Sequence, residues 1–425
     1  MNEKLLQFLW RFQYFNQQLL LTTQHEQLRI ENPGNWNNGQ GPDFSEASIR
    51  INNTRWVGNI ELHLRSSDWF RHRHQSDLHY TNIILHVVWD DDAAVYDGHG
   101  NPLPTLVLAP LVPKLLLQKY AAMMATMQMI PCHRFLPAMS HLAWCSWKER
   151  LAAERLERKS GNILLIYRQT GQNWEALCWW LLAGNFGTRV NSLLFEEVAR
   201  TIPLAIMAKH SNQLHQLEAL LLGQANLLAA TYTDPYPVML QKEYRFLQHK
   251  YKLRFISNQP AFLRMRPAAF PTIRLSQLAV FIQNCPHFFQ QIREAVDSKV
   301  ITKQLMVTAS DYWNDHYRLD EPAAYRQKHL GKEMAENILI NTVIPVLFAY
   351  GLFRNEISYR EKAIRWLYET GAEQNRITRQ WKESGVSNWS ALDSQALIEL
   401  TNFYCAEKRC LHCAAGNKIL KNSVL

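Results

Sequence analysis

The sequence has little of what marks several classes of protein. Its 425 residues include only 16 glycines and 17 prolines and no low-complexity tract, which excludes collagen-like and disordered proteins. The longest uninterrupted apolar run, residues 343–353, contains Pro345 and Gly351 and falls well short of the ~18 residues that a membrane span needs. The N-terminal segment carries charged residues within its apolar pattern and has no small-residue cleavage site, so we expect no signal peptide. These absences predict a cytoplasmic protein with no membrane partner.

Charge and cysteine content give the next indications. The 46 lysines and arginines outnumber the 37 aspartates and glutamates, and the net charge of +9 suits a polyanionic partner such as nucleic acid. The seven cysteines are an odd number, and a cytoplasmic setting argues against disulfides. Three of the seven fall within nine residues near the C-terminus. Such clustering indicates metal binding before redox chemistry.

The hydrophobic periodicity changes along the chain. Residues 1–27 have apolar positions three and four apart, as in an amphipathic helix. Short strands and turns then predominate up to about residue 112, and the remainder is largely helical. The expected strands cover residues 47–51, 56–65 and 83–89, with a hairpin turn at residues 52–54. We therefore predict an α+β protein, with an α/β domain over residues 1–112 and a mainly helical domain with a cysteine-rich end over residues 113–425.

Acidic residues mark the first candidate site. Asp43 stands at the entry to a strand, and Glu61 and His63 project from one face of the next strand. Carboxylates on neighbouring strands can converge on one Mg²⁺ or Mn²⁺ ion, which prefers oxygen ligands. Such an ion lowers the pKa of a bound water and neutralises charge that develops on a phosphate. The alternative is a hairpin with a polar outer face, in which Glu61 is solvated and Asp43 caps a turn.

This pattern resembles the PD-(D/E)XK nuclease superfamily, whose core is a helix, three strands, a helix and a strand. Pro42-Asp43 matches the first motif, Glu61 matches the acidic position, and His63 stands where the family has lysine. The resemblance implies a restriction-endonuclease-like core in which Asp43, Glu61 and the Leu62 carbonyl bind the metal and His63 positions the attacking water. Because histidine is not a permanent cation, the departure at His63 affects the prediction of catalysis more than that of fold.

Histidines are unusually frequent just after this motif. Five of the 16 lie between residues 63 and 86, namely His63, His72, His74, His79 and His86. In the nuclease hypothesis, His72 and His74 contact substrate phosphate together with Arg71 and Arg73. Histidine with carboxylate suits Mn, Fe or Zn better than Mg. An alternative function is therefore a Zn or Mn hydrolase of another substrate, with His63, His72, His74 or His79 on the metal. His86, within an apolar strand, is expected to be a hydrogen-bonded core residue.

The C-terminal cysteines form the second candidate site. Cys405, Cys410 and Cys413 have C-x₄-C-x₂-C spacing, which can ligate Zn²⁺ or an iron–sulfur cluster. A fourth ligand is needed, and Cys132 is the first choice, with His412 the local alternative. One distant cysteine with three clustered ones resembles the iron–sulfur staple of some nucleases of the superfamily. The alternative interpretation is that the three C-terminal cysteines are unliganded thiols near a helix end.

Polar residues in the helical region are expected to serve packing. Four of them are set among apolar residues and should be buried hydrogen-bond partners: Asn191, Glu218, Gln224 and Asn341. Basic residues on one helix should form a solvated face, with phosphate contact the second interpretation. The residues concerned are Lys148, Arg150, Arg155, Arg158 and Lys159.

Phrases spread over nearly the whole chain resemble a bacterial family of unknown function. They lie at residues 37–44, 56–63, 67–74, 185–191, 218–225, 341–350 and 394–396, and in the cysteine-rich end. That family supplies no activity, so the functional hypothesis depends on the residues themselves. It is a metal-dependent phosphodiesterase that acts on nucleic acid. The rival is a non-catalytic nucleic-acid-binding or scaffold protein that retains the nuclease-like fold.

Overall fold

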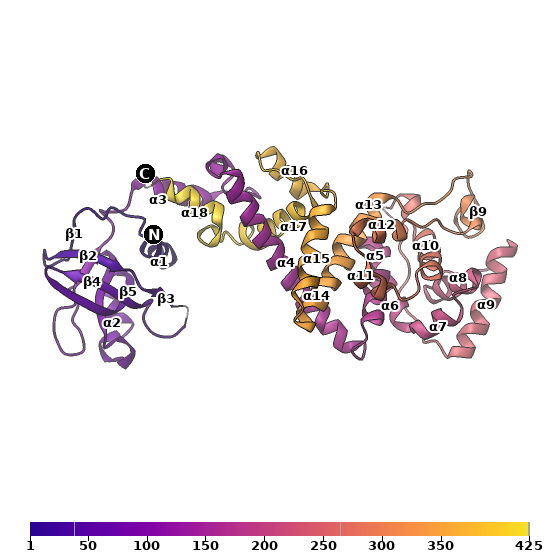
Figure 1. The fold of residues 1–425 in the computed structure, drawn as a ribbon, viewed down its shortest axis with the longest axis horizontal. Helices are drawn as coiled ribbons and strands as arrows, with labels where there is room; N and C mark the ends of the chain where they lie inside the picture. The colour runs from indigo at the N-terminus through magenta and orange to yellow at the C-terminus, as the bar shows by residue number, and fades with distance from the viewer. Residues whose placement is uncertain (38, 264, 424–425) are drawn as a thin grey trace. The chain divides into compact units, whose positions relative to one another are not determined.

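The computed structural model describes residues 1–37, 39–263 and 265–423 (Figure 1). It has a mixed α+β fold, with a sheet-containing N-terminal region followed by helices. Asn38, in one of the phrases noted above, lies outside the described residues. Contacts divide the chain into a first unit of Met1–Trp144 with Leu400–Leu425, and a second unit of Cys145–Glu399. These units differ from the sequence division at residue 112, because the C-terminal segment packs with the N-terminal one and no local pattern records that contact.

A single mixed sheet lies at the centre of the first unit. Its strand order is β1-β2-β4-β5-β6-β7, and β3 also pairs with β4. The strands are β1 (Leu20–Leu21), β2 (Gln27–Asn32), β3 (Asn35–Trp36), β4 (Phe44–Ile51), β5 (Thr54–Arg65), β6 (Ile83–Asp90) and β7 (Thr105–Val107). The neighbours β4 and β5 are antiparallel, whereas β5 with β6, and β6 with β7, are parallel. Strand β5 therefore lies inside the sheet, with hydrogen-bonded neighbours on both sides.

The expected hairpin between β4 and β5 is present. Ile51 pairs with Thr54, so the turn is formed by the two residues between them. Asn52 has a φ of +53°, in the left-handed region that asparagine tolerates better than most residues. The Asn-Asn sequence therefore fixes the hairpin turn and, with it, the register of β4 against β5.

The N-terminal helix is shorter than the periodicity suggested. Helix α1 (Glu3–Phe12) begins at Asn2, whose side chain accepts a hydrogen bond from Leu5 N at 2.9 Å. It ends at Gln13, which adopts a left-handed conformation with φ +55°. The apolar positions after it belong to a loop and to strand β1. The prediction of a helix over residues 1–27 is therefore wrong beyond residue 12.

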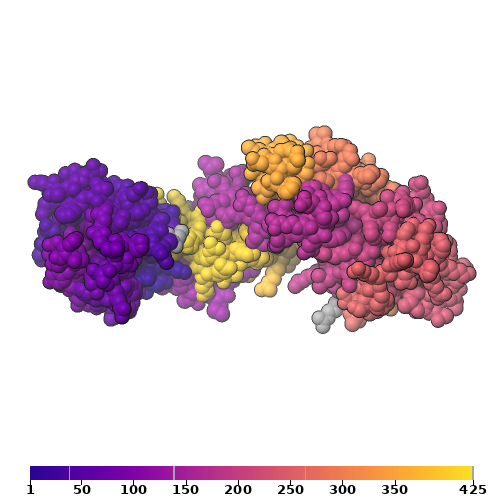
Figure 2. Space-filling view, turned by 90° about the horizontal axis from the view of Figure 1, so that it is seen from below, coloured from indigo at the N-terminus to yellow at the C-terminus, as the bar shows by residue number. Residues whose placement is uncertain are grey.

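The rest of the first unit is helical and combines both ends of the chain. The elements are α2 (Asp68–Arg71), η1 (His74–Ser76), η2 (Leu78–Tyr80), α3 (Lys114–Ala125), η3 (His133–Ala138), η7 (Leu400–Cys405), η8 (Cys410–His412) and α18 (Ala414–Lys421). Helix α18 contacts α3 and η3, and Tyr14 Oη donates a hydrogen bond to Asn417 Oδ1 at 2.7 Å. Figure 2 shows these C-terminal residues, in yellow, against the indigo and purple residues of the first unit.

The second unit is almost entirely helical. Helix α4 (His141–Gln169) enters it from the first unit. Its own helices are α5 (Trp174–Phe186), α6 (Thr188–Thr201), α7 (Leu204–Lys209), α8 (Leu214–Gln224), α9 (Pro235–Tyr251), η4 (Pro267–Ala269), α10 (Pro271–Asn284), α11 (Phe288–Glu294), α12 (Ser298–Leu305), η5 (Asp311–Asn314), α13 (Lys332–Ile338), the π-helical η6 (Leu339–Val343), α14 (Ile344–Arg354), α15 (Ile357–Glu369), α16 (Arg376–Glu383) and α17 (Ala391–Glu399). A small hairpin joins β8 (His316–Arg318) and β9 (Glu321–Pro322).

One continuous helix, Lys332–Arg354, is long and apolar enough to cross a membrane by length and composition alone. It is longer than the apolar run seen in the sequence because α13, η6 and α14 join without a break. Within the protein, 72% of its most apolar window is buried. The helix is therefore placed as a central packing element of the second unit.

Buried polar residues hold the helices of the second unit together, as expected. Glu218 in α8 is completely buried, and its carboxylate accepts hydrogen bonds from the side chains of Tyr236, Ser276, Ser310 and Trp313. Burial raises the pKa of this carboxyl group, and the four donors oppose that rise. A carboxylate with four donors is a well-satisfied buried group.

Asn191 and Gln224 confirm this packing role, whereas Asn341 is only partly buried and lines a cavity. Asn191 exchanges two hydrogen bonds of 2.9 Å with the backbone of Ala261. Gln224 Oε1 accepts a bond of 3.0 Å from Tyr244 Oη, and Asn341 Oδ1 accepts one of 3.0 Å from Lys159 Nζ. These side chains join elements that are distant in the sequence.

The basic residues of α4 do not all form a solvated face. Lys148 is only 2% exposed, and its Nζ donates to Ser387 O at 2.6 Å and to Asp393 Oδ1 at 3.0 Å. Arg155 and Arg158 both bind the Glu399 carboxylate. The interpretation of these residues as a solvated face is therefore wrong for Lys148. The helix uses such cations to pair with acidic groups of the second unit, which the sequence separation concealed.

Candidate metal site in the N-terminal sheet

Asp43 and Glu61 lie together at the centre of the sheet. Glu61 is in β5, and Asp43 is the residue before β4. Asp43 N donates a hydrogen bond to Glu61 Oε2 at 3.0 Å, and Leu62 N donates to Asp43 Oδ2 at 3.1 Å. Gln7 Nε2, from α1, donates to Asp43 Oδ1 at 2.8 Å. These bonds leave Glu61 Oε1 as the carboxylate oxygen that faces the histidines.

Burial disfavours the ionisation of both carboxyl groups. Burial raises the pKa of Glu61 to about 9, and the negative charge of Asp43 adds to that rise. Burial likewise raises the pKa of Asp43 to about 6, although the Leu62 amide partly offsets it. Two buried acids with raised pKa values are an arrangement that a bound cation would stabilise.

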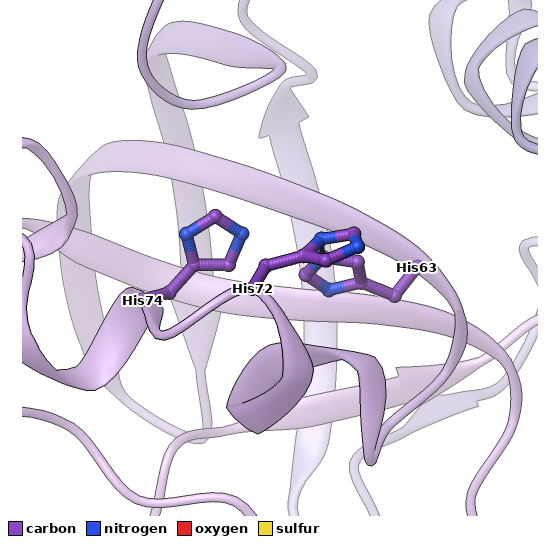
Figure 3. A group of neighbouring side chains, drawn as sticks. All are labelled: His63, His72 and His74. Atoms are coloured by element: carbon purple, nitrogen blue, oxygen red, sulfur yellow. Dashed lines mark hydrogen bonds between the residues drawn. The ribbon is translucent and has the colours of Figure 1, made fainter.

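Three imidazoles, those of His63, His72 and His74, lie near one another (Figure 3). One nitrogen from each of His63, His72 and His74 lies within 4.8 Å of the other two. His63 Nε2 and His72 Nδ1 are 3.1 Å apart. The Oε1 atom of Glu61 is 3.5 Å from His74 Nε2 and 3.7 Å from His63 Nε2. The three nitrogens thus lie within reach of one ion, and Glu61 Oε1 lies beside two of the three rings.

A left-handed residue brings His72 and His74 to the same place. Helix α2 ends at Arg71, and Arg73 has a φ of +60° before η1 begins at His74. On a continuous helix these two side chains, which are two residues apart, would point in different directions. The turn at Arg73 directs both rings towards His63 on β5. Neither hydrophobic periodicity nor residue type signals such a turn at an arginine.

Burial keeps His63 and His74 neutral. Burial and the neighbouring histidines lower the pKa of His74 to about 4 and that of His63 far below its ordinary value. His74 is 10% exposed, and neither of its ring nitrogens has a hydrogen-bond partner among the described residues. Neutral imidazole is the form that binds metals, and an unpartnered buried nitrogen is costly. The chemistry of this donor set therefore fits a divalent transition-metal ion.

His86 supports the cluster from the next strand. Its position in β6 pairs with Glu61 in the sheet, and its Nε2 lies 2.8 Å from His63 Nδ1. It is completely buried and hydrogen-bonded, as the sequence suggested. Its contact with His63 was not foreseen, because the parallel pairing of β5 with β6 is not visible in either strand alone.

The other sequence candidates lie around the cluster or outside it. Arg71 is exposed and pairs with Asp68 at 3.0 Å, and Arg73 is exposed. His79 is exposed and does not belong to the described three-histidine group. Tyr80 was missed, and its ring stacks on His74 with a centroid separation of 3.7 Å. Its place next to His79, at the end of the histidine-rich segment, was the signal that could have identified it.

The cysteine candidates also converge, at a separate place in the first unit. Cys132, Cys405, Cys410 and Cys413 are all buried, and all four line one small cavity. Its other lining residues are Pro131, Tyr404, Arg409 and Gly416. His412, the local alternative for a fourth ligand, is not among the lining residues, and its ring instead lies 6.1 Å from that of Trp36. The geometry therefore favours Cys132 as the fourth member.

Comparison with known families now places the chain. The model of a family described as "Protein of unknown function (DUF2851)" matches residues 3–376. The chain belongs to the DUF2851 family. The matched segment contains the three-histidine group, both carboxylates and Cys132, whereas the three C-terminal cysteines lie beyond it. No curated protein and no solved structure matches the chain. Because the family has no described function, the functional argument depends on the side chains of this DUF2851 protein alone.

Proposed function

We propose that the protein is a metal-dependent phosphodiesterase acting on nucleic acid, with its ion held by His63, His72, His74 and Glu61. The observation that carries this proposal is the convergence of the three ring nitrogens within 4.8 Å of one another, beside Glu61 Oε1. His63 comes from a central, buried strand, whereas His72 and His74 come from the more exposed turn between α2 and η1. When bound, the ion would act as a Lewis acid on a phosphate oxygen and lower the pKa of a water.

The donor set favours a transition metal over Mg²⁺. Imidazole suits Zn²⁺, Mn²⁺ or Fe²⁺, whereas Mg²⁺ prefers carboxylate, carbonyl and water oxygens. Both oxygens of Asp43 accept hydrogen bonds from protein groups, and Glu61 Oε2 accepts one from Asp43 N. Asp43 is therefore assigned mainly to positioning Glu61. His72 and His74, first considered as phosphate contacts, are assigned to the ion.

His86 determines which nitrogen of His63 is available. If His63 Nδ1 carries the hydrogen and donates it to His86 Nε2, the lone pair of His63 Nε2 faces His72 and Glu61. A second partner of this kind fixes the tautomer and orientation of a metal-binding histidine. We therefore assign His86 a positioning role.

Topology and charge support nucleic acid as the substrate. In the PD-(D/E)XK resemblance, Asp43 and Glu61 stand at the acidic positions, and the order of α1, the β4–β5 hairpin, α2 and the parallel strand β6 is compatible with such a core. Exposed Arg71 and Arg73 flank His72, which is itself exposed. A substrate phosphate that approached from the side of His72 would meet these cations. The net charge of +9 suits the same partner.

The test is metal binding followed by cleavage. Metal-free protein is titrated with Mn²⁺, Zn²⁺, Fe²⁺ and Mg²⁺, and each form is incubated with labelled single-stranded and double-stranded DNA and RNA. We expect a transition ion to bind and support cleavage. His74→Ala should weaken that binding by more than ~10²-fold, because it removes a ligand rather than an outer partner. His79→Ala is the matched control, since this exposed histidine lies in the same segment but outside the group.

Two results would contradict the proposal. Equal metal affinity in the His74→Ala and His79→Ala proteins would remove the ion from this site. Metal binding at the site without cleavage of any nucleic acid would leave the non-catalytic role. In that case, hydrolysis of other esters by the loaded protein would identify the hydrolase alternative.

A further inference from the structure

Four buried cysteines line one cavity in the first unit, one from the segment before α4 and three from the C-terminal segment. Cys132 directly precedes η3, Cys405 ends η7, Cys410 begins η8, and Cys413 precedes α18. Each is between 5% and 8% exposed. The structure shows no disulfide at any of the four described positions. None of these residues takes part in the three-histidine group.

The backbone around the three clustered cysteines is tightly folded. Lys408 has a φ of +52°, and Arg409 N donates to Tyr404 O at 2.8 Å. Cys413 N then donates to Cys410 O at 3.3 Å. These bonds turn the chain back on itself between Cys405 and Cys413, so that the thiols can face a common centre despite their short spacing.

Gly416 shows how closely the next helix packs on this turn. A Cβ atom at Gly416 would lie only 2.1 Å from Cys410 O. Real Cβ atoms do not approach a backbone oxygen so closely, and backbone cannot move aside as a flexible side chain can. Only glycine therefore lets α18 start here and hold Cys413 beside Cys410.

One cationic residue lies at the cavity, although burial raises the pKa of the Cys132, Cys405 and Cys410 thiols above the ordinary value. Arg409 lines the cavity, and its guanidinium lies 4.9 Å from the ring centroid of Tyr404, which lines the cavity too. Four thiolates around a divalent ion carry a net negative charge, which a nearby cation offsets.

We propose that Cys132, Cys405, Cys410 and Cys413 form a tetrathiolate metal centre, which joins the C-terminal segment to the segment before α4. This site is independent of the proposed function. Zinc and iron–sulfur clusters both use four cysteines. The four sulfurs do not all lie within 4.8 Å of one another. Thiolates ~2.3 Å from a zinc ion are ~3.8 Å apart, so zinc requires this ring to contract, whereas a cluster accepts a wider ring.

The test uses the full chain, purified without oxygen from cells supplied with zinc and iron. The protein carries His63→Ala and His74→Ala, so that metal at the three-histidine group does not contribute. We expect about one equivalent of zinc, or iron with acid-labile sulfide and visible absorption. The first result identifies a zinc site and the second an iron–sulfur cluster. Adding Cys132→Ser or Cys410→Ser should remove that metal, whereas Cys285→Ala, at a buried cysteine of the second unit, should not.

A second measurement uses no cysteine substitution, so it remains informative if a variant fails to fold. The unsubstituted protein is treated with an alkylating reagent before and after metal removal, by chelator for zinc or by oxidation for a cluster, and labelled cysteines are identified by mass spectrometry. The four cysteines should be protected together and become reactive together. The proposal is overturned if the purified protein contains no zinc and no iron. It is also overturned if both serine substitutions leave the metal content unchanged. Reactivity of the four thiols that is the same before and after metal removal overturns it too.

Discussion

The amide of Asp43 donates a hydrogen bond to Glu61, and the next amide along from Glu61, that of Leu62, donates one back to Asp43. This reciprocal pair joins the start of β4 to the middle of β5. It fixes one oxygen of each carboxylate and leaves Glu61 Oε1 directed at the histidines. The pair also keeps two acidic groups together in a buried place, and several measurable effects follow from that.

The first prediction concerns stability of the metal-free protein. The pKa of Glu61 is about 9 in the folded protein and near its ordinary 4.5 when unfolded. Its contribution to stability is therefore complete below about pH 4.5 and is lost as the pH rises towards 9. Asp43, whose pKa is raised to about 6, acts in the same direction. Glu61→Gln cannot ionise, so it avoids this pH-dependent loss of stability. The variant should therefore melt at a higher temperature than the parent at pH 8 but not at pH 4.5. Melting curves that stay equally separated across this range would contradict the prediction.

The second prediction concerns protons released by the metal. Glu61 must lose its proton to bind an ion, whereas the lowered pKa values of His63 and His74 mean that these rings are already neutral. Metal affinity should therefore rise between pH 6 and 9. Calorimetry in buffers of different ionisation enthalpy should detect about one proton released per ion at pH 7. In the Glu61→Gln protein, that release should disappear along with most of the affinity. Proton release unchanged by this substitution would assign the proton to another group.

The third prediction concerns His86. His86→Phe removes the partner of His63 Nδ1, while a ring still fills the space on β6. We expect metal affinity to fall by ~10- to 100-fold, the effect usual for an outer partner of a metal ligand. His86→Gln, which can still accept a hydrogen bond, should recover part of the affinity. A merely structural role would instead lower the melting temperature of both variants without changing the metal affinity of the folded protein.

The fourth prediction compares two helical glycines. Gly416 in α18 has no room for a Cβ atom, whereas a Cβ at Gly161 in α4 would meet no atom within 4 Å. Gly161→Ala should stabilise the protein by up to ~1 kcal/mol through helix propensity. Gly416→Ala should lower the melting temperature and expose the C-terminal cysteines to alkylation. Equal behaviour of the two variants would show that α18 can move away from η8.

Sequence patterns could predict the site only where local chemistry determined it. The Asn-Asn turn and the alternation in β5 were visible, so Glu61 and His63 could be placed on one face of a hairpin. The pairing of β5 with β6 on its other side could not be predicted. His86 was therefore assigned to the core, and its contact with His63 was missed. The left-handed conformation of Arg73 leaves no mark in composition, and it decides whether His72 and His74 meet or diverge.

Long-range packing explains the other differences. The spacing of the C-terminal cysteines indicated a metal site, and Cys132 was selected because a fourth ligand was missing. The end of α1 at Gln13 was not anticipated, because apolar residues continue beyond it with helix-like spacing. Lys148 was expected in solvent because its acidic partner, Asp393, lies far along the chain. In each case the deciding contact joins residues that no local window contains.

The division of the chain into units has a consequence for synthesis. The second unit, Cys145–Glu399, is one continuous stretch, whereas the first needs both Met1–Trp144 and Leu400–Leu425. A ribosome therefore releases every residue of the second unit before Tyr14 can meet Asn417, or Cys132 can meet Cys405. Domains generally fold as units when their residues have emerged. The unit whose synthesis starts first is therefore the last to be completed, because α18 can pack on α3 and η3 only after the second unit has been synthesised.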